Sequence, residues 1–205
     1  MLQPELKARM EQAIKDLKAG KLIIVADDVD REGEGDLIGV AEFVTPEAVN
    51  TMVTKAKGLL CAPVGPEVAA RLGIEPMTKD IDAFGTPFSV GLDAKTTSTG
   101  VSAFDRAKTI KALADKNSTY DSFYHPGHIF PLLAKAGGVL TRNGHSEAGV
   151  DLAKLAGAEP VAYIIEILKD DGTMARTADL EKFAAQEDLT LISIAELQEY
   201  LRNEK

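Results

Sequence analysis

Strand-like and helical segments alternate along the whole chain, and this alternation restricts the possible folds more than any other feature. Apolar runs that suit strands lie at residues 21–26, 36–43, 58–64, 87–92, 161–168 and 189–193. Segments with helical spacing or helix-capping residues lie at 4–19, 45–56, 65–73, 102–115 and 146–157, and further helices flank 189–193. Without a repeat or a flexible linker, this mixture predicts one α/β domain: a mixed β-sheet covered by helices.

The ends of several predicted helices carry capping signals. Pro4 suits the first turn of the first helix, and Thr45 is the expected N-cap of the second. Ser102 is followed three residues later by a carboxylate, and residues 193–196 read Ser-Ile-Ala-Glu, which is a capping box. After the helix that begins at Ser102, we expect a polar and aromatic loop as far as Pro126.

Charge balance and cysteine content exclude several classes of protein. The 205 residues, 45% of them hydrophobic, can bury one sizeable core, so residues 1–205 are expected to form a single domain. The formal net charge of −9 argues against a nucleic-acid partner. Cys61 is the single cysteine, which excludes an intramolecular disulfide and a cysteine-built zinc site. We expect no signal peptide, no membrane partner and a cytoplasmic location.

An acidic segment, "ADDVDREGEGD" at residues 26–36, follows the first predicted strand. A solvated turn is the ordinary interpretation of such a charge run. A calcium-binding EF-hand loop is excluded, because Gly39 stands where a glutamate is needed and a strand precedes the segment. The third interpretation is a magnesium and substrate site at a strand end, where Arg31 suits an oxyanion and Gly33 and Gly35 allow close backbone approach.

The three histidines are His125, His128 and His145. An isolated histidine is more often structural than functional, but two of these have distinctive settings. His128 follows a Pro-Gly turn and precedes an apolar run, and His145 lies directly before a predicted helix. The N-terminus of that helix can hold a phosphate, to which Arg142 adds charge and Ser146 a hydroxyl. Ser146 as a plain N-cap is the alternative, and the two roles are compatible.

Two residues lie inside apolar runs that suit strands. Glu166 interrupts "VAYIIEIL", where a buried carboxylate is costly unless it is paired or protonated, so it is a candidate for proton transfer. An edge position facing water is the alternative. Cys61 lies in "GLLCAPV" and is most simply a small buried hydrophobic residue.

Six motifs resemble the 3,4-dihydroxy-2-butanone 4-phosphate synthase family: "DDVDREGEGD", "GLLCAPV", "STGVSAFDRAKTI", "HPGHIFPL", "GGVLTRNGHSEAGVDLAKLAG" and "DDGTMAR". The resemblance runs in order from about Leu17 to the C-terminus. It implies a three-layer mixed sheet with helices, a homodimer and a lyase of riboflavin biosynthesis. That enzyme converts D-ribulose 5-phosphate, a sugar phosphate, to L-3,4-dihydroxy-2-butanone 4-phosphate and formate. No fused GTP cyclohydrolase II domain is expected.

The resemblance also implies roles for individual residues. Glu32 and His145 are the implied metal ligands, for Mg²⁺ or alternatively Mn²⁺, with two ions per site. His128 and Glu166 are the implied catalytic residues. The implied substrate contacts are Arg31, Glu32, Asp36, Arg142, Asn143, Gly144, His145, Ser146 and Glu166. The group that takes the C3 proton is left open between Asp36, Glu166 and the remaining acidic segment.

The chain departs from the family pattern at several positions. Val29 replaces an acidic residue and Gly33 an asparagine of the acidic segment, and Gly33 is expected to make the empty loop more mobile. Ser146 replaces threonine but keeps the hydroxyl. His125 and Leu133 stand where the family usually has arginine, which lowers the expected phosphate affinity. A sugar-phosphate or cation-binding homologue with weak or no catalysis is therefore the alternative function.

Overall fold

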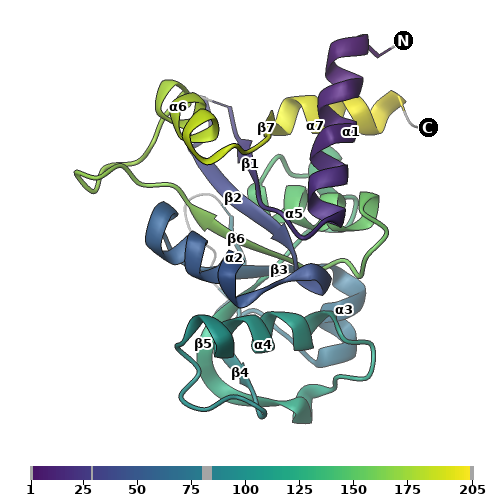
Figure 1. Cartoon of the computed structure of the whole chain (residues 1–205). Coiled ribbons are helices and arrows are strands. Elements are labelled where there is room, and N and C mark those ends of the chain that lie inside the picture. Colours follow the sequence, from purple (N-terminus) through teal and green to yellow (C-terminus); the bar gives the residue numbers. More distant parts are fainter. Residues whose placement is uncertain (1, 29, 80–84, 204–205) are drawn as a thin grey trace.

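A mixed seven-stranded β-sheet forms the centre of the molecule, in the strand order β4-β5-β3-β6-β2-β1-β7 (Figure 1). The computed structural model describes residues 2–28, 30–79 and 85–203, so Val29 lies outside the described residues. The strands are β1 (Ile23–Ala26), β2 (Gly35–Val40), β3 (Cys61–Val64), β4 (Leu92–Ala94), β5 (Phe123–Leu133), β6 (Ala162–Glu166) and β7 (Leu191–Ser193). β1 pairs parallel with β7 and β3 with β5, whereas the remaining neighbours are antiparallel.

Helices cover both faces of the sheet, which makes the three layers that the sequence predicts. They are α1 (Pro4–Lys18), α2 (Pro46–Thr51), α3 (Pro66–Leu72), α4 (Ala103–Ala114), α5 (His145–Leu155), α6 (Thr177–Glu187) and α7 (Ile194–Asn203). Short 3₁₀ or π segments lie at Ala41–Phe43, Met52–Ala56, Tyr120–Ser122 and Gly138–Leu140. None of the helices in the described ranges is long and apolar enough to cross a membrane.

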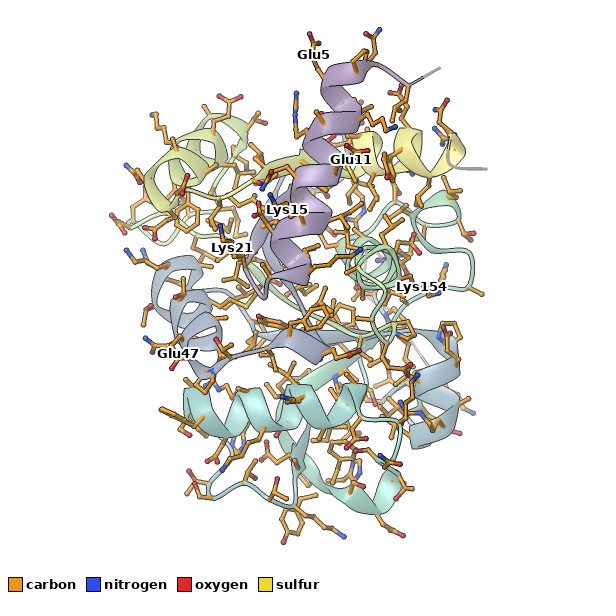
Figure 2. The ribbon with its side chains drawn as sticks, turned by 45° about the vertical axis from the view of Figure 1, so that its right-hand side comes forward. Glu5, Glu11, Lys15, Lys21, Glu47 and Lys154 are labelled. Atoms are coloured by element: carbon orange, nitrogen blue, oxygen red, sulfur yellow. The ribbon has the colours of Figure 1, made fainter. Side chains whose placement is uncertain are left out.

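The alternation of side chains along the strands divides the core in two. Ile23 and Val25 of β1 pack with α1, α5 and α7 on one face, whereas Ile24 packs with α2, α3, α4 and α6 on the other. α1 and α7 lie together near both chain ends, and α4 lies at the opposite end beside β4 and β5 (Figure 1). The exposed side of α1 is charged, with Glu11 and Lys15 along it (Figure 2). The predicted α/β fold class is confirmed.

The capping signals have the geometry expected of them. The Oγ1 of Thr45 accepts from the amide of Ala48 at 3.1 Å. The hydroxyl of Ser102 likewise accepts from the amide of Asp105 at 3.1 Å. Capping hydrogen bonds of this kind stabilise a helix by about 1 kcal/mol each. Local sequence therefore determines where these helices begin.

Two expectations around β4 and β5 are wrong. Residues 87–92 form isolated bridges rather than a strand, because regular pairing begins only at Leu92, next to a close contact between Gly91 O and Gly127 N at 2.7 Å. The expected loop up to Pro126 already contains the start of β5 at Phe123. Pro126 is tolerated there because β3 pairs only with residues 130–133, so the missing N–H interrupts no ladder on that side.

Candidate active site

The acidic segment is the connection of the β1–β2 hairpin, and Asp27 holds it folded. The carboxylate of Asp27 accepts from the amides of Glu32 and Glu34 at 3.3 and 2.8 Å. It also pairs with Nη1 of Arg31 at 2.8 Å, and Nη2 of Arg31 lies 2.8 Å from Glu32 Oε1. One buried carboxylate thus organises the loop, and a solvated turn does not describe it.

Strand register brings a second pair of carboxylates together. Asp36 of β2 lies opposite Glu166 of β6. Both residues share the sheet face of Ile38 and Ile164, which is the face covered by α5. Glu166 is half-buried, and its Oε2 accepts from the amide of Leu59 at 2.7 Å. Glu166 is therefore at the end of a central strand and not on a sheet edge.

His145, the first residue of α5, faces these carboxylates. Its Nε2 lies 3.1 Å from the carbonyl oxygen of Val25, so Nε2 carries the hydrogen and Nδ1 points into the site. Nδ1 lies 3.8 Å from Glu32 Oε2 and 3.9 Å from Asp36 Oδ2. Burial favours the neutral ring, but the surrounding carboxylates, chiefly Asp36, raise the pKa of His145 to about 9.

The charges of this cluster suit a divalent cation. Ligand atoms of Asp27, Glu32 and His145 all lie within 4.8 Å of one another. Burial raises the pKa of Asp36 to about 7, and its Oδ1 is buried without a hydrogen-bond partner in the described part of the chain. Burial also raises the pKa of Glu34. Carboxylate oxygens and an oriented imidazole are donors that a metal ion would satisfy.

Cationic and hydroxyl groups form the other wall. Nη1 of Arg142 pairs with the fully buried Glu147 at 2.6 Å, and Nη2 donates to Thr86 Oγ1 at 3.1 Å. Ser146 lies buried in the first turn of α5. The expectation that Ser146 is the N-cap is wrong: the helix begins at His145 and the N-cap is Gly144. The extended backbone of Gly144 leaves the first-turn amides directed toward this wall.

A cavity of about 210 Å³ connects the two walls. Its lining includes seven of the predicted site residues: Arg31, Glu32, Asp36, Arg142, His145, Ser146 and Glu166. Asn143 and Gly144 adjoin it in sequence but are not among its lining residues. Seven positions from four separate sequence segments therefore meet in one small polar space.

His128 lies elsewhere, on β5. Its Nδ1 is 2.7 Å from Oδ2 of Asp93, and its amide donates to Oδ1 of the same carboxylate at 3.0 Å. Gly100 packs against this pair, where a Cβ would lie 2.2 Å from Asp93 Oδ2. His128 is not among the lining residues of the cavity, and its side chain is 48% exposed. The carboxylate orients the ring and leaves Nε2 as the outward-facing nitrogen.

The structure places the departures from the family pattern outside the cavity. The ring of His125 stacks on Tyr120 with centroids 4.4 Å apart. Leu133 packs against the core on the α4 side of the sheet. Cys61 does line the cavity, but burial raises the pKa of its thiol, which keeps it neutral and unreactive.

Sequence reasoning missed several residues of this region. Asp27 and Glu34 were counted in the acidic segment without a role of their own. Thr86 lies in an irregular segment with no local signal. Asp93 and Glu147 are recognisable only through their partners on other elements. Their roles depend on strand register and helix packing, which single residue types do not specify.

The fold and the cavity define the class of protein: a three-layer α/β enzyme whose site combines a carboxylate–imidazole cluster with a cationic wall. Comparison with known proteins narrows this class. Residues 11–200 match the sequence model of 3,4-dihydroxy-2-butanone 4-phosphate synthase. A protein of that name from Oceanobacillus iheyensis is 54% identical over 198 residues, covering 96% of each chain. The Riboflavin biosynthesis protein RibBA of Bacillus cytotoxicus is 51% identical over 95% of this chain, which spans 49% of that relative.

Solved structures agree with the sequence relatives. A 3,4-dihydroxy-2-butanone 4-phosphate synthase in complex with two magnesium ions superposes with a TM-score of 0.90 at 38% identity, covering 95% of this chain and 96% of the other. The two-domain RibBX from A. baumannii gives a TM-score of 0.91 at 46% identity, covering 94% of this chain and 57% of the other. The chain belongs to the 3,4-dihydroxy-2-butanone 4-phosphate synthase family, as its motifs predict.

Proposed function

We propose that the chain is a lyase of riboflavin biosynthesis that converts D-ribulose 5-phosphate to L-3,4-dihydroxy-2-butanone 4-phosphate and formate. The observation that carries the proposal is the cavity that joins the cluster of Glu32, Asp36 and His145 to Arg142 and the first turn of α5. A phosphorylated ketose requires both ends: oxygen-handling groups at its carbonyl and hydroxyls, and cationic or amide donors at its phosphate. Membership of the family supports this reaction.

Glu32 and His145 are the proposed ligands of Mg²⁺, with Mn²⁺ as an alternative and two ions in each site. The raised pKa of His145 supports this assignment, because the proton on Nδ1 lies where a cation would be held by the same carboxylates. The two magnesium ions in a solved relative support the ion count. A bound Mg²⁺ would act as a Lewis acid toward the ketose oxygens.

The remaining residues of the cavity would orient the substrate and move protons. Arg142, Ser146 and the backbone of residues 143–145 would hold the phosphate, which fixes the reacting carbons beside the carboxylates. Arg31 would donate to substrate oxygens. Asp36 and Glu166, together with the other carboxylates of the acidic loop, are the candidates for accepting the C3 proton. A pKa of about 7 suits Asp36 to proton exchange near neutral pH.

His128 requires a second copy of the chain in this proposal. Within one chain it lies outside the cavity, oriented by Asp93 with its ring half exposed. The surface around β4, β5 and the start of α4 also exposes Tyr124, Val101 and Phe104 at 55%, 45% and 63%. Such apolar exposure favours a protein contact. We therefore propose a homodimer in which His128 of the partner subunit reaches the cavity.

Mixing two inactive variants tests this arrangement. Glu32→Gln and His128→Asn are each expected to be inactive as homodimers. Equal mixing should restore about one quarter of wild-type activity, because half of the dimers are mixed and each keeps one intact site. Mixing that restores no activity would place both residues in a site built from one chain.

Formate release tests the proposed reaction itself. Protein stripped with EDTA should release no formate from D-ribulose 5-phosphate, and added Mg²⁺ should restore the release. Substrate binding without formate release would instead indicate the non-catalytic homologue. Full activity in metal-free protein would contradict the metal assignment.

A further inference from the structure

Arg176 joins the acidic loop to a part of the chain that lies far away in the sequence. Its Nη1 donates to the backbone carbonyl oxygens of Glu32 and Gly33, the latter at 2.9 Å, and lies 3.8 Å from Glu34 Oε1. Arg176 is not among the residues that line the cavity. The guanidinium therefore contacts the loop from outside while Asp27 binds it from within.

The main chain of Arg176 is itself held in place. Arg176 is the N-cap residue of α6, and its amide donates to Asp179 Oδ2 at 3.1 Å. Its carbonyl accepts from the amide of Leu180 at 2.9 Å. Leu180 then packs on the loop so closely that a Cβ at Gly35 would lie 2.5 Å from its Cδ1. α6 is thus a rigid support that meets the loop at two adjacent points.

The loop needs such a support because its own chemistry favours opening. Gly33 has a φ of +63°, a conformation that glycine adopts and leaves at little cost. The carboxylates of Glu32 and Glu34 lie near Asp36 and repel one another when no cation is bound. Contacts with the carbonyls of two successive residues restrict the rotation of the backbone that carries Glu32. A positive charge close to Glu34 also offsets part of the repulsion.

We propose that Arg176 is a positioning residue that clamps residues 32–34 and so directs Glu32 toward His145. Its effect on catalysis rests on the proposed function, because Glu32 is the proposed metal ligand there. The clamp itself is a property of the metal-free protein, and it can be measured without turnover.

The test compares Arg176→Ala with Arg176→Lys and with Asp179→Ala. The Asp179 variant is the matched control, because it removes the cap of α6 but leaves the guanidinium. In metal-free protein, hydrogen exchange across residues 27–36 should accelerate by about tenfold in Arg176→Ala, and the control should match wild type. Calorimetric Mg²⁺ affinity should fall by about tenfold in Arg176→Ala, with partial recovery in Arg176→Lys.

Unchanged exchange in Arg176→Ala would overturn the clamp. Equal acceleration in Asp179→Ala would also overturn it, since helix capping would then be the cause. A loosened loop with unchanged Mg²⁺ affinity would overturn the positioning of Glu32. Wild-type protein that releases no formate contradicts the proposed function instead, and the exchange experiment still decides the clamp.

Discussion

Replacing Asp36 by asparagine tests the electrostatics of the site, because it removes the charge and keeps the shape. Burial raises the pKa of Asp36 from its ordinary value of 3.8 to about 7; His145 opposes this rise and Glu166 adds to it. Between these two pH values, the folded protein keeps a proton that the unfolded chain releases. The free energy of unfolding of wild-type protein therefore falls as pH rises through this window.

The size of the effect follows from the two pKa values. Each unit of pH in this window lowers the free energy of unfolding by about 1.4 kcal/mol, and the slope fades near the folded pKa. From pH 5 to pH 7, Asp36 alone should lower it by about 2 kcal/mol. His145 acts in the same direction at higher pH: its stabilisation is complete below 6.5 and is lost as pH rises through about 9.

Urea unfolding of metal-free protein at pH 5, 6 and 7 measures this directly. The difference between wild type and Asp36→Asn cancels the contributions of other titrating groups. We expect that difference to change by about 2 kcal/mol across the range, in favour of the variant at pH 7. Asp121→Asn, at an exposed position of the 3₁₀ turn before β5, should give no change. Parallel curves for wild type and Asp36→Asn would refute the reasoning.

Three further substitutions separate the roles of the cavity walls. Glu166→Gln should lower kcat by about a hundredfold with KM little changed, and steady-state kinetics that show only a KM effect would contradict proton transfer. Arg142→Ala should raise KM by at least about tenfold and destabilise the fold by about 3 kcal/mol or more, because Glu147 then lies buried without its cation. Kinetics and urea unfolding without either change would show that neither contact matters. Gly35→Ala should cost about 1–3 kcal/mol by displacing Leu180, and an unchanged urea midpoint would contradict the close packing.

Those features of the fold that depend on local chemistry could be predicted from the sequence. Thr45 and Ser102 mark helix starts because a hydroxyl that accepts from a nearby amide needs no distant partner. Pro126 misled because its effect depends on which neighbour strand pairs at that position. A proline signals a turn in isolation but is harmless where only one side of a strand is paired.

The candidate site was predictable in composition but not in geometry. The acidic segment and His145 could be assigned to one site from their chemistry. The pairing of Asp36 with Glu166 required the register of β2 against β6, which a sequence does not specify. Arg142 was read as a phosphate ligand, yet it also neutralises the buried Glu147. A glutamate in a first helical turn looks like an ordinary surface residue until its burial is known.

The central claim is that Glu32 and His145 hold a divalent cation in this cavity. Titrating metal-free protein with Mn²⁺, and following the free ion by electron paramagnetic resonance, tests that claim without requiring turnover. Glu32→Gln should bind Mn²⁺ at least about tenfold more weakly than wild type, whereas Asp121→Asn should bind it equally well. A Glu32→Gln variant that binds Mn²⁺ as tightly as wild type would contradict the metal site on which the account depends.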